Sequence, residues 1–174
     1  MTLHYPRLRG PVRLVGYCDA AWENLNNGKT GGGVLICFTD SDGRNGGETF
    51  GPISWLAGRL KRVVRSTFAS ETLIASETVD ELLHLSETWQ EITGEKVHGF
   101  LRTESRSLYD HIYWKGSCHE KSLVVELSVI REAVEEGLVM EVQWVETKVQ
   151  LADALTKKMV PHALLRALQT SRLP

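Results

Sequence analysis

Three stretches rich in β-forming residues open the chain, and each predicts a strand. They lie at 12–18 (VRLVGYC), 32–38 (GGVLICF) and 48–55 (ETFGPISW). The third contains a proline, which removes a backbone donor, so we expect it at the edge of a sheet. Its Trp55 is expected in the core. The segment at 39–47 (TDSDGRNGG) is typical of a long hairpin loop. The pattern therefore predicts three consecutive antiparallel strands.

After these strands the apolar positions follow a helical period. They recur every three or four residues from Thr67 to about Ile92, and Gly94 would end that helix. The elements that follow are a strand at 97–101, a helix at 105–112, an amphipathic helix at 121–136 and a strand at 138–145. A last helical segment begins near Val149, and Pro161 either kinks it or starts a separate helix.

This order of elements predicts an α/β fold: a five-stranded mixed sheet flanked by helices, with three antiparallel strands followed by parallel ones. The later strands are joined by helices, and such crossovers connect parallel strands. A chain of 174 residues can bury a core without disulfides, so we expect one domain over 1–174, with 1–11 as a lead-in and 161–174 as a C-terminal extension or helix. Ligands would bind where the parallel strands end.

Composition limits the ligands and the cellular compartment that we expect for this protein. With 20 Lys and Arg against 22 Asp and Glu, the formal charge of −2 argues against a polybasic nucleic-acid binder but leaves specific binding open. Three separated cysteines, Cys18, Cys37 and Cys118, are expected to be free and buried, which indicates an intracellular, reducing compartment. No apolar stretch is long enough for a membrane span. The acid-free first 18 residues leave organelle targeting open.

Four acids fall where predicted strands end or helices begin. Asp19 follows the first apolar run, and Glu104 follows the fourth strand. Glu71 lies in the opening turns of the long helix, in line with its apolar face, and Asp153 lies in the first turn of the last helix. Each has a simpler interpretation, as a turn residue, a helix-start residue or a favourable charge near a helix N-terminus.

Taken together, the four acids predict a metal site. Uncompensated carboxylates at one edge of a sheet could not all stay ionised without strongly raised pKa values, and a divalent cation removes that conflict. Oxygen ligands without nearby Cys or His suit Mg²⁺ or Mn²⁺. Two such ions about 3.5–4 Å apart form a clamp for phosphodiester hydrolysis.

Five sequence blocks carry a resemblance to a known family. They are GYCDAAW at 16–22, GGGVL at 31–35, PISWLAGRLKRVVRSTFASETLIAS at 52–76, TESRSLYD at 103–110 and WVETKVQLADALTKKM at 144–159. In this order they resemble the ribonuclease H domain of copia-type (Pseudoviridae-like) LTR retrotransposon polyproteins, over almost the whole chain. The resemblance implies a ribonuclease H-like fold and endonucleolytic cleavage of the RNA strand of an RNA/DNA hybrid.

The resemblance also implies a site of four acids that binds two Mg²⁺ or Mn²⁺ ions. Asp19, Glu71 and Asp153 match three of the family's acids, whereas Glu104 stands where the family has Asp. The longer side chain matters because Mg²⁺ demands near-ideal geometry. The cellular enzymes also place a His about ten residues before the last acid, and Gln143 occupies that region here.

Two hypotheses of function follow. The first is an active ribonuclease H of retroelement origin, which acts on RNA/DNA hybrids. The second is a domesticated, catalytically inactive ribonuclease H fold that serves as a structural or RNA-contacting subunit of a multiprotein or ribonucleoprotein assembly, with structured RNA as its partner. Glu104 favours the second, and the other three acids favour the first.

A basic segment upstream of Glu71 is the predicted nucleic-acid contact. Its members are Arg59, Lys61, Arg62 and Arg65, followed by Ser66 and Thr67. The four cations would bind phosphates, and the two hydroxyls would contact 2′-hydroxyls of an RNA strand. A solvated surface stretch is the alternative for the cations, and a helix N-cap is the alternative for Ser66 or Thr67.

Overall fold

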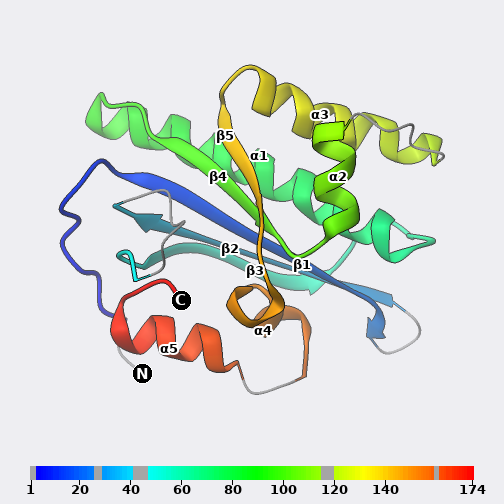
Figure 1. Cartoon of the computed structure of the whole chain (residues 1–174), viewed down its shortest axis with the longest axis horizontal. Helices are drawn as coiled ribbons and strands as arrows, with labels where there is room; N and C mark the ends of the chain where they lie inside the picture. The colour runs from blue at the N-terminus through cyan, green and yellow to red at the C-terminus, as the bar shows by residue number, and fades with distance from the viewer. Residues whose placement is uncertain (1–2, 26–28, 41–46, 115–119, 159–160) are drawn as a thin grey trace.

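Five strands form one mixed sheet in the order β3-β2-β1-β4-β5 (Figure 1). In the computed structural model, which describes residues 3–25, 29–40, 47–114, 120–158 and 161–174, β1 pairs antiparallel with β2, and β2 with β3. The pairs β1–β4 and β4–β5 are parallel. The strands are β1 (Arg13–Leu25), β2 (Lys29–Thr39), β3 (Gly51–Arg59), β4 (His98–Thr103) and β5 (Val139–Trp144). The predicted fold class is confirmed.

Helices cover both faces of this sheet. They are α1 (Thr67–Thr93), α2 (Arg106–Trp114), α3 (Val124–Glu135), α4 (Asp153–Thr156) and α5 (His162–Thr170), with short 3-10 turns at Lys121–Leu123 and Thr147–Val149. Figure 1 shows α1, α2 and α3 on one side of the sheet and α4 and α5 on the other. Alternate residues of β1 point into two apolar cores, Leu14 and Cys18 toward α1, and Val15 and Tyr17 toward α5.

The long helix α1 begins and ends where its sequence signals predict. The side chain of Ser66 accepts a hydrogen bond from the backbone N–H of Ala69, which caps the first turn. Gly94 ends the helix in the left-handed conformation, with φ of 77°. Leu82 of α1 packs against the backbone of β1, where a Cβ on Gly16 would come within 3.2 Å of it. The helix is therefore held in contact with the strand that carries Asp19.

The C-terminal part differs from the single helical segment predicted from Val149. It forms a 3-10 turn, the four-residue α4 and, after Pro161, the separate helix α5. Proline cannot continue a helix but suits its first turn, so of the two alternatives the separate start is the one found. The C-terminal segment packs on this sheet, because Ala167 and Leu173 are buried in the same core as Tyr17.

Other predictions have mixed outcomes. Strand β3, which contains Pro52, is an edge strand as expected. Trp55, expected in the core, is 57% exposed because it lies on that edge strand. Cys18 and Cys37 are free and buried, whereas Cys118 and most of the 39–47 loop lie outside the described residues. Among the helices that the structure describes, none combines the length and apolar character needed to cross a membrane.

Candidate active site

Asp19 lies inside β1 rather than after its end. The strand was expected to end at Cys18, but its antiparallel pairing with β2 continues through Asp19, opposite Gly33. The parallel pairing with β4 does stop at Cys18, opposite Thr103. Asp19 therefore sits one residue beyond the last parallel pair, and it is only 1% exposed. This is the edge of the sheet at which ligands of open α/β folds bind.

Glu104 follows β4 directly and faces the same edge. The start of α2 is capped by Ser105, whose hydroxyl accepts a hydrogen bond from the backbone N–H of Leu108 at 3.3 Å. Glu104 is therefore not needed as a helix-start residue. Its Oε2 is buried without a hydrogen-bond partner. The simpler interpretation of this acid does not account for its position.

Asp153 is brought to this edge by the anchoring of α4. Gln150 is buried, and its Nε2 donates a hydrogen bond to the carbonyl oxygen of Cys18 at 3.0 Å. Gly33 on β2 leaves room for α4, because a Cβ there would lie 2.9 Å from Leu155 and Thr156 atoms. The glycine-rich start of β2 thus has a packing role, which is to let Asp153 approach Asp19.

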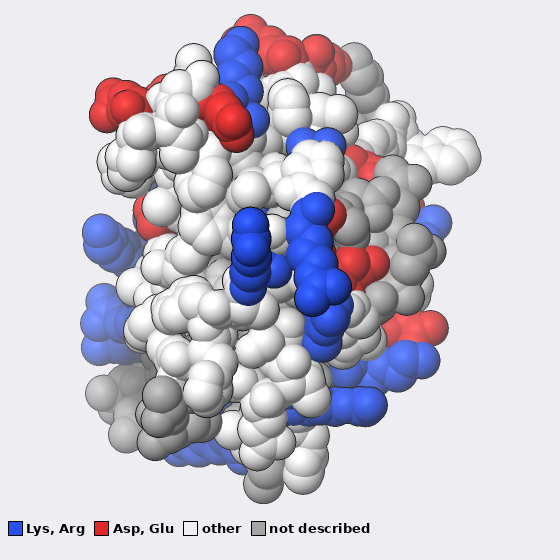
Figure 2. All heavy atoms as spheres, turned by 90° about the vertical axis from the view of Figure 1, so that its left-hand side faces the viewer, with Lys and Arg blue, Asp and Glu red and all other residues white. Residues whose placement is uncertain are grey.

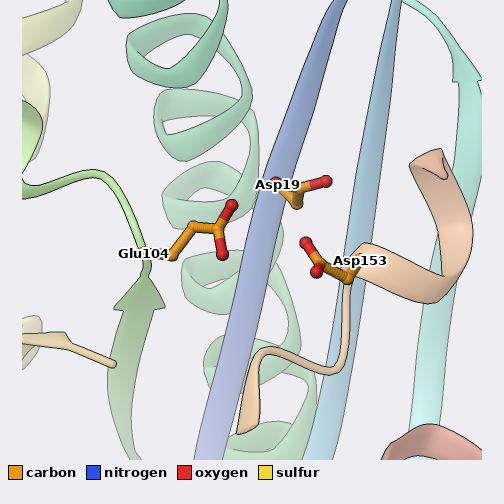
Figure 3. A group of neighbouring side chains, drawn as sticks. All are labelled: Asp19, Glu104 and Asp153. Atoms are coloured by element: carbon orange, nitrogen blue, oxygen red, sulfur yellow. The ribbon is translucent and has the colours of Figure 1, made fainter. Parts of the chain in front are cut away.

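The three carboxylates form one cluster, which we call the carboxylate cluster: Asp19, Glu104 and Asp153. Each offers an oxygen within 4.8 Å of those of the other two. Figure 3 shows the three side chains turned toward one another from β1, the end of β4 and the start of α4. Asp19 Oδ1, like Glu104 Oε2, has no hydrogen-bond partner. Buried oxygens without partners are uncommon in proteins, so they call for a ligand.

Glu71 lies beside this cluster but is not one of its closest members. It is 4% exposed on the inner face of α1, as its spacing predicts. Burial, reinforced by the negative charge of Asp19, raises the pKa of Glu71 to about 8, although a hydrogen bond from the Ala20 backbone opposes the shift. Its Oε2 also lacks a hydrogen-bond partner. The charges of Asp19, Glu104 and Lys157 therefore act on the fourth predicted acid, although it is not one of the three residues whose oxygens lie closest together.

Lys157 is the residue that sequence reasoning missed. Its Nζ contacts Asp153 directly, lies 3.2 Å from Glu104 Oε1 and 3.8 Å from Asp19 Oδ1. Burial disfavours the ammonium, but the hydrogen bond to Asp153 and the other two carboxylates raise the pKa of Lys157 above its ordinary value. The available signal was its spacing, since a Lys four residues after an Asp can pair with it.

Thr156 completes the environment of Asp19. Its hydroxyl donates a hydrogen bond to Asp19 Oδ2, which leaves Oδ1 directed at the cluster. Burial raises the pKa of Asp19 to about 6, and the contacts with Thr156 and Lys157 limit the rise. Burial also raises the pKa of Asp153, despite its bond to Lys157. One lysine thus only partly compensates the four acids.

This donor set fits a hard divalent cation. All of the candidate ligands are carboxylate oxygens, which Mg²⁺ and Mn²⁺ prefer. Two of the oxygens in the cluster have no hydrogen-bond partner, and their carboxyls carry raised pKa values or lie beside groups that do. A cation bound to them would satisfy the oxygens and favour the ionised forms.

Only some of the predicted nucleic-acid contacts line a common hollow. Arg62 forms a salt bridge with Glu126, and together with Arg65 and Lys121 it lines a hollow of about 680 Å³ beside the start of α1. Arg59 and Lys61 are exposed and do not line that hollow. Ser66 is the N-cap, as one of its two interpretations requires, and Thr67 begins the helix. Contact of this segment with nucleic acid stays a prediction.

Basic surface also extends beyond this segment. Figure 2 shows Lys and Arg side chains over the middle and lower part of the left-hand side of Figure 1, with Asp and Glu mainly at its top and along one margin. Arg7, Arg9 and Arg172 line a second hollow, of about 530 Å³, together with Asp40 and Thr49. The net charge of the chain therefore conceals an uneven distribution of charge over its surface.

Fold and site together define a ribonuclease H-like architecture. The chain resembles the N-terminal RNase H domain of Rv2228c from Mycobacterium tuberculosis, with a TM-score of 0.58 and 13% identity over 92% of this chain and 96% of that one. It also resembles LC11-RNase H1, isolated from compost, with a TM-score of 0.60 and 14% identity over 87% and 98%.

A structure of LC11-RNase H1 in complex with an RNA/DNA hybrid gives a TM-score of 0.54, with 16% identity over 87% of this chain and 99% of that one. No protein-family model matches the chain, and no curated protein matches it in sequence. At these identities the similarity establishes the ribonuclease H-like fold.

Proposed function

We propose that this protein is a divalent-metal-dependent endonuclease that hydrolyses the RNA strand of RNA/DNA hybrids. The observation that carries the proposal is the carboxylate cluster, whose oxygens lie within 4.8 Å of one another and include buried atoms without hydrogen-bond partners. The position of the cluster on a ribonuclease H-like sheet supports it. The copia-like sequence blocks support a retroelement origin.

The residues of the site have distinct tasks in this function. Asp19, Glu104 and Asp153 would hold Mg²⁺ or Mn²⁺, and Glu71 would complete the set for a second ion. The hydroxyl of Thr156 holds one oxygen of Asp19 and so fixes the direction of the other. Bound ions would activate a water for attack on the phosphodiester and stabilise the leaving oxygen.

The substrate class rests on two supports. The LC11-RNase H1 structure that shares the fold was obtained with an RNA/DNA hybrid. In this chain, exposed cations precede α1, the helix that carries Glu71. Phosphates of a duplex would bind these cations, while selection of the RNA strand needs contacts to 2′-hydroxyls. The segment that begins at Arg59 and ends at Thr67 is the proposed contact.

A gel assay on a labelled RNA/DNA hybrid tests this function. With Mg²⁺ or Mn²⁺, the wild-type protein is expected to cut the RNA strand, and Asp19→Asn is expected to cut at least about 100-fold more slowly because a ligand is lost. Glu104→Asp tests the shorter side chain found in the resembled family. Cleavage that survives in Asp19→Asn would show a contaminating nuclease and remove the support for the site.

The alternative, an inactive domesticated fold within a larger assembly, is favoured by one observation. Lys157 already supplies a cation to three carboxylates, as a structural ion pair would. In that case neither wild type nor Glu104→Asp would cut, and the protein would bind structured RNA or a partner through its surface instead. Recovery of cleavage in Glu104→Asp alone would identify a site disabled at one residue.

A further inference from the structure

The ammonium of Lys157 reaches oxygens of the same three carboxylates that a divalent ion would use. It contacts Asp153 Oδ1, Glu104 Oε1 and, at 3.8 Å, Asp19 Oδ1. These are atoms of the three acids whose oxygens lie within 4.8 Å of one another. A divalent ion bound to these atoms and the ammonium cannot occupy the same space. Their like charges also repel each other strongly at a few ångströms.

We propose that Lys157 is a built-in competitor of the divalent ion: its ammonium holds the carboxylate cluster together and must withdraw for the ion to bind. This inference rests on the proposed metal-dependent function. Lys157 then sets the concentration of divalent ion at which the site becomes occupied. Loading of the site becomes an exchange of one cation for another.

The exchange is possible without movement of the backbone. Helix α4 is fixed, because Leu151 and Ala152 before it are buried and Gln150 is bonded to the carbonyl of Cys18. The Lys157 side chain, in contrast, is 34% exposed and has a flexible four-carbon stem. It can turn into solvent while the carboxylates stay in place. The part that moves is therefore the side chain alone.

The ammonium is also an incomplete ligand for the cluster. Asp19 Oδ1 is buried in a residue that is 1% exposed, and it makes no hydrogen bond even though Lys157 lies 3.8 Å away. Glu104 Oε2 is likewise without a hydrogen-bond partner. A single positive charge leaves these oxygens unsatisfied, whereas a divalent ion can coordinate several carboxylates at short range. Coordination of the carboxylates by a divalent ion is therefore more favourable than their contact with the ammonium, so the ion can displace Lys157.

Calorimetric titration of Mn²⁺ into the whole chain tests the proposal. Lys157→Met keeps most of the side-chain volume but removes the competing charge, so it is expected to bind Mn²⁺ at least about tenfold more tightly than wild type. Lys158→Met is the matched control, because Lys158 is the next residue, carries the same charge and is exposed. It is expected to bind as wild type does. Equal or weaker binding by Lys157→Met would overturn the proposal.

Thermal unfolding gives a second measurement that is independent of catalysis. In chelator, Lys157→Met is expected to melt at a lower temperature than wild type because the cluster loses its cation. Added Mn²⁺ should then raise its melting temperature more than that of wild type. An equal Mn²⁺ effect in both would contradict the competition. Lys157→Gln, which keeps a hydrogen-bond donor, takes the place of the Met variant if that variant does not fold in chelator.

The outcomes separate the two proposals. If wild type and Lys157→Met bind Mn²⁺ equally and wild type cuts the hybrid, the competition is wrong while the nuclease function stands. If neither binds Mn²⁺ and neither cuts, the metal-dependent function itself is wrong, and the competition falls with it. Tighter binding by Lys157→Met that is lost in the double variant with Asp153→Asn supports both.

Discussion

Two largely buried polar clusters lie next to each other along β1 and β4, and their polar atoms are satisfied to different extents. The first, which we call the arginine cluster, consists of Tyr17, Arg102 and Gln143. Arg102 donates to the hydroxyl of Tyr17 and to Gln143 Oε1, the latter at 3.0 Å, and its guanidinium lies 5.2 Å from the centre of the Tyr17 ring. None of these three side chains has a buried polar atom without a partner. In the carboxylate cluster, Asp19 comes two residues after Tyr17 on β1, and Glu104 comes two residues after Arg102, directly after β4.

This is the difference expected between a cluster that serves the fold and one that binds a ligand. A polar group that serves only the fold is expected to have its hydrogen bonds satisfied, as in the arginine cluster. The carboxylate cluster instead collects like charges, leaves buried oxygens without partners and raises the pKa values of Asp19 and Asp153. Proteins keep such arrangements mainly at sites that bind or react. Neutralising an acid beside the carboxylate cluster should therefore affect stability in the opposite direction to removing the cation of the arginine cluster.

The largest expected effect is in the arginine cluster. Arg102→Met should lower the free energy of unfolding by about 2–4 kcal/mol, because it removes a buried guanidinium and its hydrogen bonds to the buried Tyr17 hydroxyl and to the half-buried Gln143. Denaturation by urea measures this. The control is Arg106→Met, since Arg106 is exposed and forms a surface salt bridge with Asp110, for which the expected cost is below about 0.5 kcal/mol. If both variants lose the same free energy of unfolding, the arginine cluster does not stabilise the fold as expected.

A smaller and opposite effect is expected beside the carboxylate cluster. Burial and the charge of Asp19 raise the pKa of Glu71 from 4.5 to about 8. Between these values the folded protein keeps a proton that the unfolded chain has released, so the stability of wild type should fall as the pH rises from about 5 to 8.5. Glu71→Gln cannot ionise, so it should be about 1–2 kcal/mol more stable than wild type at pH 8.5 in chelator.

Urea denaturation at both pH values measures this difference. At pH 5, where Glu71 is already protonated in the folded state, the variant and wild type should differ little. Glu77→Gln is the control, because Glu77 lies on the same helix but is exposed; its effect should not depend on pH in this way. A Glu71→Gln variant that is less stable than wild type at pH 8.5 would mean that the ionised carboxylate is stabilised by the fold.

The fold could be predicted from the sequence largely because its signals are local. β-forming residues indicated β1, β2 and β3, the helical period of apolar residues indicated α1, and Gly94 marked its end. The errors arose where distant contacts decide the outcome. Asp19 was placed after a strand because the sequence does not reveal that the pairing of β1 with β2 runs past Cys18. Trp55 was expected in the core, but it lies on an edge strand, and the sequence does not reveal that its side chain is left exposed there.

The candidate site could be predicted only in part, for the same reason. The inward face of α1 identified Glu71 as buried, and Asp19, Glu104 and Asp153 do meet. Lys157 was not expected, because its contacts with Asp19 and Glu104 join residues that are far apart in the chain. Only its pairing with Asp153, four residues earlier in the chain, could have been inferred from sequence spacing. The sequence could not show that a lysine lies among these acids, because the fold brings them together.

Binding of a divalent ion by the carboxylate cluster can be seen in a crystal structure of the whole chain grown with Mn²⁺, with anomalous scattering to locate the ion. We expect a peak about 2–2.4 Å from oxygens of Asp19, Glu104 and Asp153, with the ammonium of Lys157 turned away from them. No peak at this position, with Lys157 still in contact with all three carboxylates, would contradict it.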